Sequence, residues 1–205
     1  MSTVAAGGAI HRPEAANGDA FVLTHGAGSN ADAPLLVRMA DVLAARGYLV
    51  LRYNLPFRVE RPKGPPFPAQ AARDREGVAR AVSVVRAMAS GRVFVGGHSY
   101  GGRQSAMAAA ETQGLADGLL LLSYPLHPPR KPAQMRTAFF PQLRTPALFV
   151  HGTADPFGTI GELREAIAAS PARTAIVEIE GAGHDLRRAP DYAARIVERF
   201  EALRQ

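Results

Sequence analysis

The sequence feature that most restricts how this chain can fold is the segment from Val93 to Ala110. It opens with a short apolar run, typical of a buried strand, and ends in an Ala-rich stretch, typical of a helix. Between them stands the pattern Gly97-x-Ser99-x-Gly101. Strand, Gly-x-Ser-x-Gly and helix together predict a sharp turn that lifts the Ser99 hydroxyl clear of a sheet and strains the serine backbone. We expect glycine on either side because side chains there would collide in so tight a turn.

Taken alone, the five-residue pattern also fits a glycine-rich turn with an incidental serine. The residues elsewhere in the chain have to distinguish these two interpretations.

With 205 residues, the chain suits a single domain with a sizeable core. We expect a poorly specified N-terminal lead-in over residues 1–18 and one domain over residues 19–205. The absence of cysteine excludes disulfides and thiolate metal sites. No apolar run approaches the length of a membrane span and no signal-peptide pattern is present, so we expect a cytoplasmic protein that does not bind membranes.

The net charge of +6 allows two interpretations. A basic chain can bind an anionic partner such as nucleic acid, or it can carry many arginines scattered over its surface. The Lys and Arg residues are spread along the chain and are not interleaved with aromatic residues. The scattered arrangement is therefore favoured, and we predict no nucleic-acid partner.

Predicted strands alternate with predicted helices along almost the whole chain. We expect strands over residues 21–24, 48–53, 93–97, 118–123, 146–151 and 175–179, and helices over 34–46, 69–90, 104–110, 161–170 and 191–203. Either Asn30 or Asp32 can cap the first helix. This alternation predicts an α/β fold with a mostly parallel central sheet and helices on both faces.

Two proline-rich connections interrupt this pattern, over residues 54–68 and 124–145. The proline content of residues 54–68 argues against a helix or a central strand there. The 124–145 connection is too short to hold a large lid domain. We therefore expect both segments to be loops that border an open site.

Three chemically complementary residues follow predicted strands in the order Ser99, Asp155, His184. A serine hydroxyl is a weak nucleophile that needs a base, and the base needs a third group to orient it. We assign Ser99 as nucleophile, His184 as general base and then general acid, and Asp155 as the group that holds the imidazole. Asp155 precedes a proline and also fits a simple Asx turn. The rival acids Asp185 and Asp191 lie too near His184 in sequence to approach it from a neighbouring strand end.

Acyl transfer also needs hydrogen-bond donors for an oxyanion. The backbone N–H of Tyr100, which follows the serine, is one candidate. The loop after the first strand should supply the other, with Ala27 as first choice and Gly28 as second. A phosphate-binding loop is a rival for this stretch, but neither G-x-G-x-x-G nor a G-K-[ST] ending is present, so nucleotide binding is not expected.

Together these residues resemble the α/β-hydrolase superfamily over roughly residues 20–204. The motifs that carry the resemblance are Gly-His-Ser-Tyr-Gly-Gly, His-Gly-Ala-Gly, Tyr-Pro-Leu-His-Pro-Pro, His-Gly-Thr-Ala-Asp-Pro-Phe-Gly and Gly-Ala-Gly-His-Asp-Leu. They look most like a small, lidless branch related to dienelactone hydrolases and to the hydrolase-like domain of a eukaryotic chromatin-complex subunit and its testis-expressed relative. Dienelactone hydrolases proper use a cysteine nucleophile, which this chain lacks.

The resemblance implies a serine hydrolase that cleaves a small carboxylic ester and needs no metal or organic cofactor. Two other functions stay open at this stage. One is a noncatalytic interaction domain that keeps the fold, and the other is perhydrolase or lyase chemistry on the same three residues. The residues by themselves do not distinguish an ester from an amide, and they do not define the oligomeric state.

The loops suggest which residues contact a substrate. Phe57, Phe67, Leu126, Phe139 and Phe140 are candidates to line an acyl pocket, with packing onto the core as the alternative. His127 is a candidate ligand contact, although a structural hydrogen bond is the better expectation. Six basic residues can gather at the rim of the site, where they would favour an anionic substrate. The alternative is that they are solvated surface charges. Arg103, in the helix that follows Ser99, is the foremost candidate. The six are Arg58, Arg61, Lys63, Arg103, Arg130 and Lys131.

Overall fold

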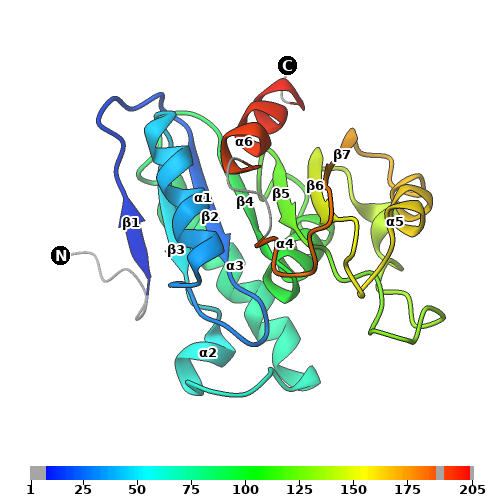
Figure 1. Cartoon of the computed structure of the whole chain (residues 1–205). Helices are drawn as coiled ribbons and strands as arrows, with labels where there is room; N and C mark the ends of the chain where they lie inside the picture. The colour runs from blue at the N-terminus through cyan, green and yellow to red at the C-terminus, as the bar shows by residue number, and fades with distance from the viewer. Residues whose placement is uncertain (1–7, 188–191, 204–205) are drawn as a thin grey trace.

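The computed structural model describes residues 8–187 and 192–203, and its framework is one sheet with seven strands in the described part of the chain. The strand order is β1-β3-β2-β4-β5-β6-β7, and every pair is parallel except β1 with β3. Figure 1 shows the sheet running through the middle of the molecule. The strands are β1 (Ala9–His11), β2 (Ala20–Thr24), β3 (Leu49–Tyr53), β4 (Val93–His98), β5 (Leu119–Leu122), β6 (Ala147–Gly152) and β7 (Thr174–Ile179).

Helices cover both faces of this sheet, as expected for a parallel sheet whose strands are buried on both sides (Figure 1). One core cluster packs α3, α4 and α5 against one face, and a second cluster packs α1 and α6 against the other. The helices are α1 (Pro34–Ala45), the short α2 (Pro56–Glu60), α3 (Ala71–Arg86), α4 (Tyr100–Glu111), α5 (Ile160–Ile167) and α6 (Tyr192–Leu203), with single 3-10 turns η1 (Pro68–Gln70) and η2 (Phe140–Gln142).

The apolar strands divide their side chains between the two cores. In β5 all four leucines are fully buried, with Leu119 and Leu121 in one cluster and Leu120 and Leu122 in the other. This alternation follows from the two-residue period of a strand. Because both faces are apolar, the strand reads as a continuous hydrophobic run, which is the pattern that predicted the α/β class. That prediction is confirmed.

The structure corrects three local expectations. The lead-in contains β1, a half-exposed three-residue strand that pairs with the edge of the sheet and is too short to show a clear pattern. Residues 54–68 contain α2, which begins at Pro56, because proline lacks only an N–H that the first helical turn leaves unused. The first helix is capped by neither Asn30 nor Asp32: Ala33 occupies the cap, and the Asn30 side chain accepts from the Asp32 amide instead.

The connection between β5 and β6 forms no lid, and its only regular element among the described residues is η2. The carboxyl ends of β2, β6 and β7 lead into loops, and β4 leads through one turn at Ser99 into α4. No helix in the described part of the chain is long and apolar enough to cross a membrane.

Candidate active site

Ser99 lies at a strained turn between β4 and α4, with φ 51° and ψ −116°. Positive φ is uncommon for a residue with a side chain and persists only where its surroundings enforce it. Here the Ser99 amide donates to the Leu122 carbonyl of β5 at 2.8 Å, and the Ser99 carbonyl accepts from the Arg103 amide of α4 at 2.9 Å. The sheet and the helix thus hold the serine from both sides.

The two flanking glycines are required by the neighbouring strand. A Cβ at Gly97 would overlap the carbonyl oxygen of Thr24, and one at Gly101 would crowd the carbonyl oxygen of His25. The elbow packs directly on the end of β2, so its glycines avoid collisions with that strand rather than with each other. This close approach brings the loop after β2 beside Ser99.

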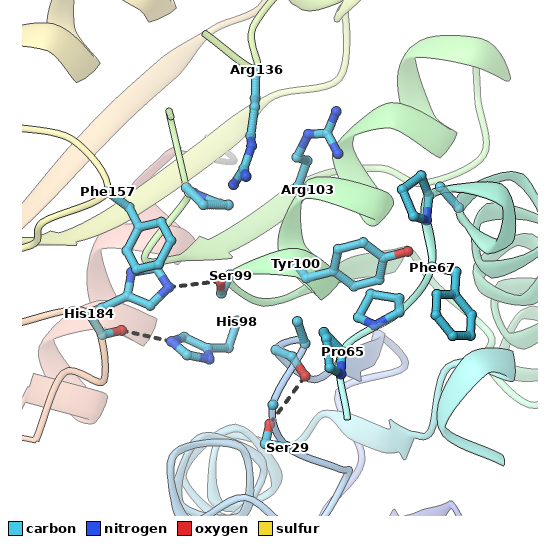
Figure 2. A pocket seen from close by; sticks show the side chains of 17 residues that line it. Ser29, Pro65, Phe67, His98, Ser99, Tyr100, Arg103, Arg136, Phe157 and His184 are labelled. Atoms are coloured by element: carbon cyan, nitrogen blue, oxygen red, sulfur yellow. Dashed lines mark hydrogen bonds between the residues drawn. The ribbon is translucent and has the colours of Figure 1, made fainter. Parts of the chain in front are cut away.

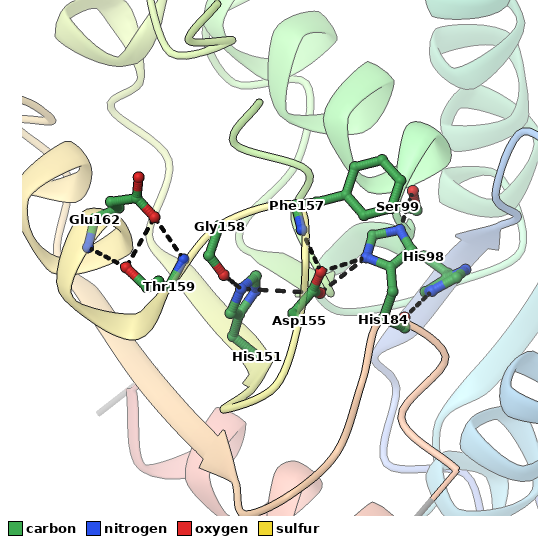
Figure 3. A network of polar contacts seen from close by, with 9 residues as sticks. All are labelled: His98, Ser99, His151, Asp155, Phe157, Gly158, Thr159, Glu162 and His184. Atoms are coloured by element: carbon green, nitrogen blue, oxygen red, sulfur yellow. Dashed lines mark hydrogen bonds and ion pairs between the residues drawn. The ribbon is translucent and has the colours of Figure 1, made fainter. Parts of the chain in front are cut away.

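Ser99, His184 and Asp155 form a hydrogen-bonded series (Figure 3). His184 Nε2 lies 2.8 Å from Ser99 Oγ, and its Nδ1 lies 2.8 Å and 3.0 Å from the two carboxylate oxygens of Asp155. A carboxylate only accepts, so Nδ1 carries the proton and the Nε2 lone pair faces the serine hydroxyl. This arrangement can remove the proton from Ser99 when its oxygen attacks.

The Asp155 carboxylate is buried and held by its own loop. Asp155 Oδ1 accepts from the Phe157 amide at 2.9 Å, which is the Asx turn that the Asp-Pro sequence also suggested. His151 Nε2 lies 3.8 Å from Asp155 Oδ2. The rival Asp185 instead pairs with Arg187 on the surface, and Asp191 falls outside the described residues. The turn therefore serves to position the acid facing His184.

His184 is also fixed by two aromatic neighbours. The Phe157 ring stacks on its imidazole with centroids 4.1 Å apart, and His98 Nε2 lies 2.7 Å from the His184 carbonyl oxygen. Burial lowers the pKa of His98, so its ring stays neutral and donates Nε2–H to that carbonyl. The backbone and the ring of His184 are both held, although its loop contains two glycines.

Ala27 and Tyr100, whose backbone amides are the predicted oxyanion donors, line the same cavity as Ser99. Neither amide donates a hydrogen bond to any of the described residues. The Ala27 loop is tied down by Arg58, which donates to the carbonyls of Ala27 at 2.7 Å and Ser29 at 2.8 Å. Arg58 was expected either at the rim of the site or as a solvated charge; it is instead buried, and its hydrogen bonds hold this loop.

His25 links the same loop to the β3–α2 connection. Its Nδ1 lies 2.9 Å from the Gly26 carbonyl oxygen, and its Nε2 accepts from the Leu55 amide at 3.1 Å. The ring is therefore neutral in the folded chain, with one nitrogen donating and the other accepting. Burial lowers the pKa of His25 from 6.5 to about 4.

This shift predicts a loss of stability in mild acid. Between about pH 6.5 and pH 4 the unfolded chain binds a proton at His25 that the folded chain excludes, so stability falls as pH falls through this window. We expect His25 to contribute about 2 kcal/mol to the drop in unfolding free energy between pH 7 and pH 5. Urea titrations at both pH values should show a drop about that much smaller in His25→Gln than in the wild type. An equal drop in both proteins would contradict this assignment.

The cavity above Ser99 has a volume of about 740 Å³ and two different walls (Figure 2). One wall is apolar and comes from Pro65, Pro66, Phe67 and Pro68 of the first proline-rich connection. The other carries Arg103 from α4 and Arg136 from the second connection. Ser99 and His184 both line the cavity, so a molecule bound there can reach the serine hydroxyl.

Some predicted contacts line this cavity and others do not. Gly28, Arg103 and Phe67 line it. Phe57 does not: helix α2 turns its ring inward, where it packs edge-on against Tyr100 with centroids 5.6 Å apart. His127 is also outside, buried with its Nδ1 2.8 Å from the Pro128 carbonyl oxygen.

The apolar candidates Leu126 and Phe140 are fully buried in the core, and Phe139 packs against that core. Sequence reasoning missed Arg136, Phe157 and His98. Two of them could have been found from their places in the sequence, because Phe157 follows Asp155 by two residues and His98 directly precedes Ser99. No neighbouring motif indicates Arg136, because it stands in an irregular loop.

Comparisons with known proteins agree with this architecture. A family model described as an alpha/beta hydrolase domain matches residues 17–198. The solved structure of Est1E from Butyrivibrio proteoclasticus with ferulic acid bound is similar at a TM-score of 0.78 and 17% identity, covering 95% of this chain and 93% of that one. Dienelactone hydrolase from Anabaena variabilis is similar at a TM-score of 0.72 and 19% identity, covering 95% of this chain and 88% of that one.

A serine hydrolase without a lid from Xanthomonas campestris is also similar, with a TM-score of 0.70 and 18% identity, covering 96% of this chain and 85% of that one. At these identities the solved structures support the fold alone. The family model spans most of the chain, from before β2 to within α6. The chain therefore belongs to the alpha/beta-hydrolase family.

Proposed function

We propose that this protein is a serine hydrolase that cleaves small carboxylic esters. The observation that carries the proposal is the hydrogen-bonded series from Ser99 through His184 to Asp155, which opens into a cavity next to two unused backbone amides. Nucleophile, base and orienting acid are the parts that covalent acyl transfer requires. The scaffolds of the comparison structures, one of them described as a serine hydrolase without a lid, are consistent with this chemistry.

In the first half-reaction, Ser99 Oγ attacks the ester carbonyl carbon while its proton moves to His184 Nε2. The tetrahedral oxyanion accepts hydrogen bonds from the amides of Ala27 and Tyr100, each worth about 3–4 kcal/mol in sites of this type. The carbon–oxygen bond to the leaving alcohol then breaks, and His184 returns the proton to that oxygen. An acyl group on Ser99 and a free alcohol result.

In the second half-reaction, water replaces the alcohol and the same groups act in reverse. His184 removes a proton from water, the hydroxide oxygen attacks the acyl carbon, and the proton passes to Ser99 Oγ as the acid leaves. Asp155 stays ionised throughout and stabilises the imidazolium that forms in each half. No step requires a metal or an organic cofactor.

Product analysis with 4-nitrophenyl butyrate tests this proposal against the alternatives. We expect stoichiometric release of 4-nitrophenol and butyrate, with a transient butyryl adduct on the protein in a quenched mass measurement. Formation of peroxybutyrate when hydrogen peroxide is added, at the expense of butyrate, would favour perhydrolysis instead. A folded protein that releases no 4-nitrophenol above the buffer rate would favour a noncatalytic interaction domain.

A further inference from the structure

Among the described residues, the cavity is lined by basic side chains without acidic ones. Two arginines, Arg103 and Arg136, line it, and no aspartate or glutamate of the described chain does. The other basic residues expected at the rim do not line the cavity. Arg61 is next to its apolar wall, where it lies over the Phe67 ring with its guanidinium carbon 4.1 Å from the ring centroid and donates to the Pro65 carbonyl. Arg103 and Arg136 are therefore the two arginines whose side chains line the cavity itself.

Neither arginine forms an ion pair within the described residues. Arg103 Nε is buried and has no hydrogen-bond partner. An unsatisfied buried donor on a charged group is costly, so an acceptor brought to this guanidinium by a ligand would be favourable. Arg61 Nε is in the same state. Eight other arginines of the described residues form ion pairs; Arg75, for instance, pairs with Glu111 at 2.8 Å.

Both arginines are held in place by their backbones. Arg103 belongs to the first turn of α4, where its amide donates to the carbonyl of Ser99. The Arg136 amide donates to the Leu126 carbonyl at 2.7 Å, and the Arg136 carbonyl accepts from the Tyr124 hydroxyl at 2.7 Å. These bonds fix the main chain from which each arginine side chain extends toward the cavity.

The two guanidinium groups also act on each other. In Figure 2, Arg136 extends from its loop toward the cavity next to Arg103, which comes from α4. Burial and the charge of Arg103 both lower the pKa of Arg136. Like charges in one partly buried place repel, and an anion bound between them would relieve that repulsion while accepting several charge-assisted hydrogen bonds.

We propose that Arg103 and Arg136 form a subsite for a carboxylate or phosphate group on the substrate, so that the preferred esters are anionic. This inference rests on the proposed hydrolase function and narrows its substrate class. The opposite wall, with its three prolines and the half-exposed Phe67 ring, suits the apolar part of such a molecule. The expected substrate therefore combines a short apolar portion with one oxyanionic group.

Two matched ester pairs test the subsite on either side of the reacting carbonyl. 4-Nitrophenyl hemisuccinate and 4-nitrophenyl butyrate differ in a charge on the acyl side, and 4-carboxyphenyl butyrate and 4-carbamoylphenyl butyrate differ in a charge on the alcohol side. We measure the ratio of kcat/KM for the anionic ester over the neutral one. In at least one pair, Arg103→Gln and Arg136→Gln should each lower this ratio about 10- to 100-fold.

Lys131→Gln is the matched control, because it removes the same charge from the same connection at an exposed position outside the cavity. It should leave the ratio unchanged. Comparing inhibition by inorganic phosphate with inhibition by butyrate shows which oxyanion the two arginines prefer. The inhibitor that binds should have a higher inhibition constant in both arginine variants. If one arginine variant fails to fold, the other still provides the test.

The outcomes separate this inference from the proposed function. Hydrolysis of the neutral esters with equal losses on both members of each pair, or the same change in Lys131→Gln, would overturn the anion subsite and leave the hydrolase function standing. No turnover of any ester by a folded wild-type protein would overturn the hydrolase function and the subsite with it.

Discussion

Replacing Ser99 with alanine is expected to lower kcat for ester hydrolysis by at least about 10⁴-fold, to a level set by the remaining amides and the cavity. The reason is that Ser99 Oγ supplies the covalent bond in the first half-reaction. The hydroxyls of Ser29 and Tyr100, which also line the cavity, do not bond to His184. The Ser99 Oγ bonds only to His184 among the described residues. Its removal should therefore leave the unfolding midpoint nearly unchanged. Steady-state kinetics with 4-nitrophenyl butyrate and a thermal melt measure the two effects.

Ser123→Ala provides a closely matched control. Ser123 follows the neighbouring strand β5, has φ 49°, and its buried Oγ makes no hydrogen bond. It therefore shares the strained backbone of Ser99 but lies outside the cavity. We expect it to keep wild-type activity. Similar activity losses in both variants would mean that backbone disturbance, and not a lost nucleophile, explains the Ser99 result.

Replacing Asp155 with asparagine is expected to lower kcat by about 10⁴-fold without disturbing the shape of the site. An amide at this position can turn an NH₂ group toward His184 Nδ1, which then becomes an acceptor. The ring proton moves to Nε2, where it faces Ser99 Oγ and blocks proton removal. The loss should appear in kcat much more than in KM, because ester binding in the cavity does not involve Asp155.

Asp185→Asn separates this effect from a general loss of negative charge near His184. Asp185 adjoins His184 in the sequence, but its carboxylate is exposed and pairs with Arg187 at 3.0 Å. Its replacement should change kcat by less than about threefold, as surface ion pairs contribute little. A loss in Asp185→Asn as large as in Asp155→Asn would contradict the assignment of the orienting acid.

The fold class could be predicted because its signals are local and repeated. Fully buried parallel strands such as β5 appear as short runs of apolar residues, and helices with one buried face follow them at regular intervals. The carboxyl ends of parallel strands meet at one edge of a sheet, and Ser99, Asp155 and His184 each follow such an end. The sequence therefore predicted that these three residues lie close together.

The remaining features depend on how irregular segments pack. Phe57 and Arg58 follow a strand in a proline-rich segment, and only the short helix α2 determines that both point inward. Arg136 reaches the cavity because the Tyr124 hydroxyl, twelve residues earlier, fixes its carbonyl. Such long-range hydrogen bonds leave no periodic pattern in the sequence, so the sequence indicated Arg103 as an anion contact but not its neighbour Arg136.

The most direct test of an activated serine is the intact mass of the protein after treatment with a fluorophosphonate. We predict one phosphonyl adduct on the wild type and on Ser123→Ala, none on Ser99→Ala, and much slower labelling of Asp155→Asn. A folded wild type that takes up no adduct, or a Ser99→Ala variant that is labelled as fast as the wild type, would contradict the assignment of Ser99 as the nucleophile.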